Sequence, residues 1–249
     1  MLPPLLLING YAATGADWDP TFLGELEASH RVLRPDNRGV GAVPLGEEEL
    51  TIAAMAADME ALLDDEEIER APVVGWSMGG FVAQELARRA PERVSALALM
   101  STDPGGEAAV PARAEVWAEL TDHSGTPREQ ATRLISLLFP PPVAVEIDRQ
   151  FGEIVAAARA GLAAATLRAQ EEAMAAWHRT EPGEAEAATP TLVLHGTEDV
   201  VIPPANAGAL TDRWPGAGVE LFEGSGHAVM AQEPQRIAAA IRLHLDEHA

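Results

Sequence analysis

One stretch of the sequence, GWSMGG from Gly75 to Gly80, places Ser77 among small residues, between a short apolar run and a helical pattern. A serine hydroxyl attacks a carbonyl carbon when an adjacent base takes its proton. When such a serine stands on a sharp strand-to-helix turn, its neighbours must be small, because bulky residues would clash. Ser77 is therefore a candidate nucleophile. An ordinary glycine-rich turn is the alternative, unless the chain also supplies a base and an acid.

Candidates for the base and the acid follow two later apolar runs. The run TLVLHG precedes TEDVVIP, which places Asp199 at the carboxyl end of a predicted strand. The run VELFEG precedes GSGHAVM, which places His227 in a loop before the last helical pattern. A catalytic histidine needs a carboxylate to orient it. We favour Asp199 for this role. Asp103, in MSTDPGG, also follows a predicted strand and is the alternative acid, or else a turn residue.

Short apolar runs typical of strands alternate with helical patterns along most of the chain. The runs lie at 5–8, 31–35, 72–76, 96–101, 190–196 and 219–224. One helical stripe follows Thr51, a predicted N-cap. This alternation predicts an α/β fold: a mostly parallel sheet of about six strands with helices on both faces. Ser77 and Asp199 are then expected at the carboxyl edge of the sheet, where ligands bind in open α/β sheets.

The segment 105–188 interrupts this alternation. It contains no convincing strand, and its Ala-, Glu- and Arg-rich pieces predict about four helices. The strand pattern resumes after it. We therefore expect a core formed by residues 1–104 and 189–249, with residues 105–188 as a helical insertion in the same folding domain.

Taken together, these motifs resemble those of the α/β-hydrolase fold superfamily, and the resemblance covers nearly the whole chain. The sequence is especially similar to the capped serine hydrolases, which include carboxylesterases, enol-lactonases and cofactor-free haloperoxidases. The resemblance implies that the helical insertion is a cap. It also implies that Ser77 is the nucleophile, that His227 is first the base and then the acid, and that Asp199 orients His227.

The resemblance implies an oxyanion hole as well. The turn NGY after the first strand matches the turn from which the family supplies one backbone amide, here that of Tyr11, and Met78 would supply the other. Asn9 stands where the family usually has histidine. Because the donors are backbone amides, the oxyanion hole does not depend on that side chain.

Side chains near these positions are candidates for a substrate pocket. They are Trp76, Val200, Val229 and Met230. The aromatic residues of the insertion are expected to form its own core: Trp117, Phe139, Phe151 and Trp177. Trp18 is expected to be structural, and His178 to be a surface or structural residue.

The composition limits the partners. The 249 residues carry a formal net charge of −22, from 39 acidic and 17 basic residues. A basic patch would have to form against this charge, so we expect neither nucleic acid nor a membrane surface as a partner. The chain lacks cysteine and lysine, which excludes thiolate catalysis, cysteine-ligated metals and Schiff-base chemistry. The amino terminus MLPPLLLING is typical of a strand and not of a signal peptide. We expect a cytoplasmic protein that needs no cofactor or metal.

These inferences predict a serine hydrolase that cleaves an apolar carboxylic ester or lactone through an acyl-enzyme. Perhydrolase or haloperoxidase-type activity uses the same triad and stays open. Hydrolysis of a carbon–carbon bond is a further alternative, although relatives with that activity often carry Asn where this chain has Trp76. A hydrolase-like ligand-binding protein, which retains the pocket but turns over slowly, is the alternative from a different class.

Overall fold

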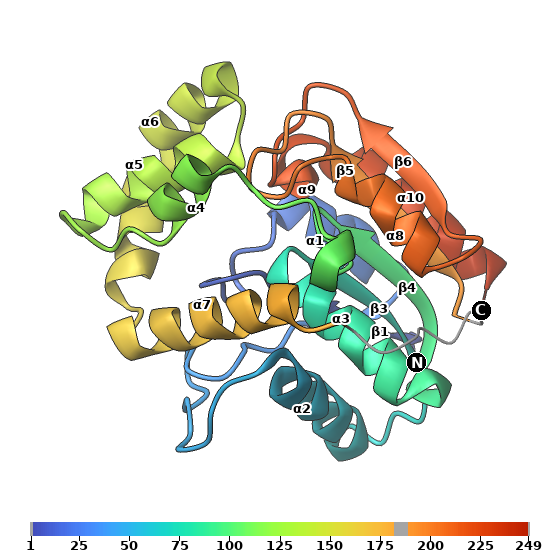
Figure 1. Ribbon diagram of the computed structural model, residues 1–249. Helices are drawn as coiled ribbons and strands as arrows, with labels where there is room; N and C mark the ends of the chain where they lie inside the picture. The colour runs from blue at the N-terminus through green and yellow to red at the C-terminus, as the bar shows by residue number, and fades with distance from the viewer. Residues whose placement is uncertain (1, 182–188, 249) are drawn as a thin grey trace.

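One sheet of six parallel strands runs through the molecule (Figure 1). The structure, a computed structural model, describes residues 2–181 and 189–248. The strands are β1 (Pro4–Ile8), β2 (Arg31–Leu33), β3 (Ala71–Trp76), β4 (Val94–Met100), β5 (Thr191–Gly196) and β6 (Gly218–Phe222). Their order is β2-β1-β3-β4-β5-β6, and every neighbouring pair is parallel. The predicted α/β fold with about six strands is confirmed.

Helices cover both faces of the sheet. One face carries α1 (Pro20–Glu27), α9 (Val229–Gln232) and α10 (Pro234–Glu247). The other face carries α2 (Ile52–Asp65), α3 (Met78–Arg89) and α8 (Asn206–Arg213). The hydroxyl of Thr51 accepts a hydrogen bond from the Ala54 amide at 3.0 Å and begins α2, as predicted. Within the described residues, no helix is long and apolar enough to cross a membrane.

Strand β1 shows how the core is divided between the two faces. Leu5 and Leu7 pack with the α1 and α10 side, whereas Leu6 and Ile8 pack with the α2 and α3 side. This follows from the two-residue repeat of a strand. All four side chains are fully buried. A sheet that is covered on both faces requires such continuous apolar runs, which is why the strands could be recognised in the sequence.

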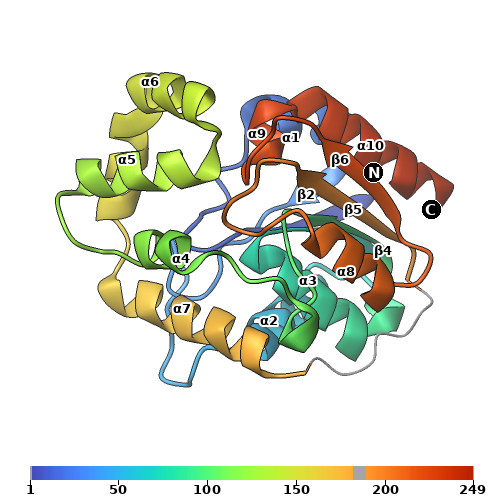
Figure 2. The ribbon, with the colours of Figure 1, turned by 45° about the horizontal axis from the view of Figure 1, so that its top comes forward.

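Between β4 and β5 the chain leaves the sheet. It forms α4 (Ala114–Leu120), α5 (Pro127–Leu138), α6 (Pro141–Ala160) and α7 (Ala164–Arg179), here called the α4–α7 segment. Figures 1 and 2 show these helices gathered at one end of the sheet, with α5 beside α6. A capping box of Thr126 and Glu129 begins α5. Four helices agree with the predicted number. Residues 182–188, the end of the expected insertion, lie outside the described residues.

Candidate active site

Ser77 stands on a sharp turn between β3 and α3. Its backbone has φ 55° and ψ −123°, a conformation that costs a non-glycine residue about 1–3 kcal/mol. The turn is too tight for side chains at the flanking glycines. A Cβ on Gly75 would clash with the Gly79 backbone, and a Cβ on Gly79 would clash with the carbonyl of Ile8. The small residues around Ser77 are therefore required by the contacts of the turn itself.

The Ser77 hydroxyl faces His227, which lies 150 residues further along the chain. The distance from Ser77 Oγ to His227 Nε2 is 2.9 Å, and His227 Nδ1 lies 2.8 Å from Oδ2 of Asp199. All three side chains are buried. An ionised carboxylate only accepts hydrogen bonds, so Nδ1 of His227 carries the ring proton and Nε2 accepts from the serine. The structure thus brings Ser77, His227 and Asp199 together in one hydrogen-bonded line.

The Asp199 carboxylate is held in its ionised form. Its Oδ1 accepts from the backbone amides of Val201 and Ile202 at 2.9 and 2.8 Å, and Nε2 of His195 lies 3.4 Å from its Oδ2. Burial raises the pKa of Asp199. The attraction of His227 and the hydrogen bonds of both imidazoles outweigh burial and hold this pKa well below its usual range. Such a carboxylate can fix one tautomer of His227 and stabilise its imidazolium form.

Asp103, the alternative acid, bonds to a different histidine. Its Oδ2 lies 2.9 Å from Nε2 of His178 on α7, and its Oδ1 accepts from the Gly105 amide at 2.9 Å. The structure therefore brings Asp199, and not Asp103, to His227. His178 was expected to be a surface or structural residue, yet it lines the same cavity as Ser77. The two partners are 75 residues apart, so no local pattern in the sequence could reveal their contact.

The turn after β1 passes beside Ser77. A Cβ on Gly10 would lie only 3.2 Å from the Ser77 Cβ, so the close approach of this turn depends on glycine. The Tyr11 amide comes next. The Met78 amide is the first of α3, where backbone N–H groups have no partner within the helix. The side chain of Asn9 donates to a carbonyl of the loop after β2 at 2.9 Å, and so anchors that loop.

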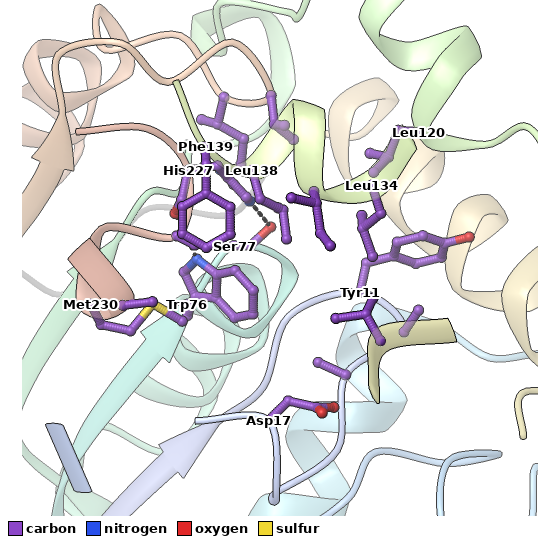
Figure 3. A pocket seen from close by; sticks show the side chains of 18 of the residues that line it. Tyr11, Asp17, Trp76, Ser77, Leu120, Leu134, Leu138, Phe139, His227 and Met230 are labelled. Carbon is purple, nitrogen blue, oxygen red and sulfur yellow. Dashed lines mark hydrogen bonds between the residues drawn. The ribbon is translucent and has the colours of Figure 1, made fainter. Parts of the chain in front are cut away.

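A cavity of about 800 Å³ opens in front of Ser77 and His227 (Figure 3). Its wall combines residues at the carboxyl ends of the strands with residues of the α4–α7 segment. Apolar side chains dominate the part that Figure 3 draws, including Leu134 and Leu138 of α5. The candidate nucleophile therefore faces a largely apolar cavity that can hold a small molecule.

Two of the four residues predicted to touch substrate line this cavity. Trp76 and Met230 are in its wall, but Val200 and Val229 are not among the described residues that line it. Val200 is 37% exposed in the turn after Asp199, and Val229 is packed in the core with α10. Val201 and Ile202, the next residues of that turn, take the place expected for Val200. These corrections arise because the direction of a loop side chain depends on tertiary packing.

The aromatic residues of the α4–α7 segment divide between two roles. Trp117, Phe139 and Phe151 line the cavity rather than only packing among themselves. Trp177 is buried, as expected for a core residue, and stacks on Phe81 with ring centres 5.5 Å apart. Trp18, expected to be structural, is buried and also lines the cavity. Helical periodicity shows which face of a helix is apolar, but it does not show whether that face meets protein or a cavity.

Trp76 supports the histidine as well as the cavity. Its indole Nε1 donates to the backbone carbonyl of His227 at 3.0 Å, and the two rings are 5.6 Å apart. The loop that carries His227 is thereby fixed to the residue just before Ser77.

A group of polar side chains lies around the hydroxyl of Tyr11. The hydroxyl donates to Glu171 Oε1 at 2.5 Å, and the same oxygen lies 2.7 Å from Nε2 of His123. Burial raises the pKa of Tyr11 far above its ordinary value, and the Glu171 carboxylate raises it further. The Arg159 guanidinium lowers it, but by less. The phenol therefore stays protonated. No local sequence pattern predicts this group, because its members come from four separate segments of the chain.

A known family of proteins matches nearly the whole chain. The family model described as "alpha/beta hydrolase fold" matches residues 3–234. The chain belongs to the alpha/beta hydrolase fold family. This match confirms the family resemblance that was inferred from the motifs. It also confirms the prediction that the chain is a hydrolase.

Three known proteins show how this hydrolase compares with other members. It is 32% identical over 243 residues to BpoC of Mycobacterium tuberculosis (strain ATCC 25618 / H37Rv), named as a non-heme bromoperoxidase, with 96% of this chain and 92% of that protein covered. It is 31% identical over 280 residues to rhodomycin D methylesterase DauP of Streptomyces sp. (strain C5), with 97% and 90% covered. The crystal structure of a hydrolase from Pseudomonas aeruginosa PA01 matches with a TM-score of 0.82 and 28% identity, covering 98% and 90% of the two chains.

Proposed function

We propose that this chain is a serine hydrolase that cleaves a carboxylic ester or lactone through an acyl-enzyme. The observation that carries the proposal is the hydrogen-bonded line from Asp199 through His227 to Ser77, which opens on an apolar cavity. The similarity to a methylesterase supports ester cleavage. The substrate is a small molecule that fits the cavity.

In the first step, Ser77 Oγ attacks the carbonyl carbon of the substrate while Nε2 of His227 takes the hydroxyl proton. A bond forms between Oγ and carbon, and an electron pair moves onto the carbonyl oxygen. In our proposal, the backbone amides of Tyr11 and Met78 donate to that oxyanion. The Asp199 carboxylate stabilises the imidazolium that forms, because it stays ionised.

The tetrahedral intermediate then collapses. The electron pair returns to the carbonyl, the bond to the leaving alcohol breaks, and His227 gives its proton to the alcohol oxygen. The acyl group is now an ester of Ser77. His227 next takes a proton from water, whose oxygen attacks the acyl carbon and forms a second tetrahedral intermediate. When this intermediate collapses, the bond between the acyl carbon and Ser77 Oγ breaks, His227 returns its proton to Oγ, and the carboxylic acid leaves. With a lactone, the leaving alcohol and the acid belong to one molecule.

We infer that the α4–α7 segment acts as the cap of this site, over a core formed by residues 1–104 and 189–249. The support is that residues from α4, α5, α6 and α7 line the same cavity as Ser77. A cover of this kind limits the size of the substrate and excludes bulk water from the reacting carbonyl.

The similarity to BpoC favours one second candidate, perhydrolysis. Hydrogen peroxide would then attack the acyl carbon in place of water, and the product would be a peracid. The same three residues would serve both reactions, so the two activities differ only in the second nucleophile.

The experiment is a panel of p-nitrophenyl esters and lactones of increasing acyl length, assayed with the wild type and with Ser77→Ala. We expect turnover by the wild type and a loss of about 10⁴-fold or more in Ser77→Ala. Adding acetate and peroxide to the same assay tests perhydrolysis. Tight binding of these compounds without turnover would overturn the proposal and favour a binding protein.

A further inference from the structure

The cavity wall contains a cation that has no counter-ion among the residues that the structure describes. Arg159, in the last turn of α6, is only 8% exposed and lines the cavity. Its Nε and Nη1 atoms are buried and have no hydrogen-bond partner. A guanidinium keeps its charge even when it is buried. Because an unpaired buried charge is costly, such a group marks a place where an anion would be stabilised.

Three carboxylates line the cavity: Asp17, Asp19 and Asp103. Asp17 accepts from the amide and the hydroxyl of Thr14, and Asp19 accepts from two amides at the start of α1. Glu171 is not in the cavity wall but lies beside the hydroxyl of Tyr11. Glu171 accepts from Tyr11 and contacts His123 through one oxygen. Asp103 is bonded to His178. Arg159 forms no ion pair within 4.0 Å with any acidic residue that the structure describes. Arg159 therefore stands in the cavity wall beside the hydroxyl of Tyr11, and its charge is not neutralised by a described carboxylate.

The position of Arg159 relative to the nucleophile follows from Tyr11. The backbone at Gly10 is packed against Ser77, and Figure 3 shows the Tyr11 ring extending away from Ser77. The Arg159 guanidinium lies close enough to the hydroxyl at the far end of that ring to lower the pKa of Tyr11 through its charge and a hydrogen bond. The length of a tyrosine side chain thus separates the cation from the serine, and apolar residues line the cavity that holds both.

We propose that the cavity takes esters or lactones whose acyl chain ends in a carboxylate, and that Arg159 binds this carboxylate. The inference rests on the proposed function and names its substrate class. The scissile carbonyl lies at Ser77, a short apolar chain follows the cavity wall, and the carboxylate supplies the counter-ion that Arg159 lacks. A guanidinium suits this task because it matches the planar geometry of a carboxylate.

The net charge of −22 does not contradict an anionic substrate. Exposed charges are screened beyond about 8 Å at physiological ionic strength. A buried cation in direct contact with a carboxylate is screened far less. The local charge at Arg159 therefore decides binding in the cavity, and the global charge affects mainly the rate of encounter.

The test compares mono-p-nitrophenyl adipate, pimelate and suberate with their methyl p-nitrophenyl diesters, which differ only in the masked carboxylate. We expect the wild type to favour the free carboxylate in kcat/KM by about 10- to 100-fold for the chain length that fits. In Arg159→Met this ratio falls to about one or below. Arg149→Met is the matched control: it removes an exposed arginine of the same helix, whose partner is Glu146, and should keep the ratio.

A ratio of one or less in the wild type, or an unchanged ratio in Arg159→Met, would overturn the proposal. Circular dichroism checks the fold of Arg159→Met, and Arg159→Gln is the second variant.

A binding measurement separates this proposal from the proposed function. By calorimetry, Ser77→Ala should bind monomethyl adipate at least 10-fold more tightly than dimethyl adipate, and Arg159→Met in that background should lose the difference. Such binding without ester turnover by the wild type would contradict the proposed function alone; equal binding of the two ligands alongside turnover would contradict this inference alone.

Discussion

Asp103 and His178 form a second carboxylate–imidazole pair, 2.9 Å apart, in the wall of the cavity that contains Ser77. Asp103 follows β4 just as Asp199 follows β5, so both carboxylates stand at the same edge of the sheet. The two carboxylates differ in the histidine that each one contacts. Asp199 contacts His227, which contacts Ser77, whereas Asp103 is directed to a helix of the α4–α7 segment.

The first prediction separates the two carboxylates. Asp199→Asn should lower kcat by about 10³- to 10⁴-fold, because an amide no longer fixes the tautomer of His227 or stabilises its imidazolium. Asp103→Asn should cost less than about 10-fold, since it loosens α7 without touching the base. Steady-state kinetics on one p-nitrophenyl ester measures both. A larger loss in Asp103→Asn than in Asp199→Asn would reverse the assignment.

The second prediction uses the only tyrosine of the chain. Burial and Glu171 raise the pKa of Tyr11 far above the ordinary value of about 10. Absorbance at 295 nm should therefore show no tyrosinate in the folded protein at pH 11, and full ionisation once the protein is unfolded at that pH. Ionisation of the folded protein near pH 10 would show that the hydroxyl is not buried beside Glu171.

The same raised pKa has a consequence for stability. Between about pH 10 and the folded pKa, the folded protein keeps the phenolic proton and the unfolded chain loses it. The free energy of unfolding should therefore fall as the pH rises above about 10, while the contribution of Tyr11 is fully present below that pH. Tyr11→Phe should flatten this alkaline fall, as measured by urea unfolding from pH 9 to 11. An equally steep fall in Tyr11→Phe would assign it to other groups.

The third prediction concerns the turn that holds Ser77. Gly75→Ala should lower the free energy of unfolding by about 1–3 kcal/mol and reduce kcat, because the added Cβ meets backbone atoms of Gly79 and Gly80, which cannot move aside without shifting the serine. Gly24→Ala is the control. It lies exposed in α1 with no atom near its added Cβ, and should raise stability by about 0.5–1 kcal/mol. An equal response of the two variants in thermal unfolding would contradict the tight turn.

The fourth prediction tests the support of His227. Trp76→Phe removes the hydrogen bond to the His227 carbonyl and should lower kcat by about 5- to 10-fold. Trp18→Phe is matched to it, because Trp18 also lines the cavity but its indole nitrogen has no hydrogen-bond partner in the described part of the chain. That variant should change KM more than kcat. If both variants affected kcat alike, the hydrogen bond would not be the cause.

Much of the fold could be predicted because its signals are local. The four inner strands, β1, β3, β4 and β5, are apolar runs that are mostly buried, whereas the edge strands β2 and β6 are largely exposed or half-buried. The runs are bounded by turns that are marked in the sequence. Ser77, Asp199 and His227 could be proposed for the same reason, since each follows a strand. The geometry that joins them could not be predicted, because it depends on the order of the strands across the sheet.

The cavity wall was much less predictable. Arg159 and His178 lie on amphipathic helices, where a charged residue is usually a solvated one. Their places in the cavity wall depend on how α6 and α7 pack against the turn after β1 and against Asp103. Val200 shows that loop residues are equally hard to predict. Its side chain is exposed, whereas the side chain of the next residue, Val201, lines the cavity. Tertiary contacts determine whether such a side chain points to solvent or into the cavity.

The central claim, that Ser77 is a nucleophile activated by His227, is tested most directly by labelling with a fluorophosphonate and mapping the adduct by peptide mass spectrometry. We predict one phosphonyl group per chain on the peptide that contains Ser77, much slower labelling in His227→Gln, and none in Ser77→Ala. Labelling that persists in Ser77→Ala, or an adduct on another residue of the wild type, would contradict the claim.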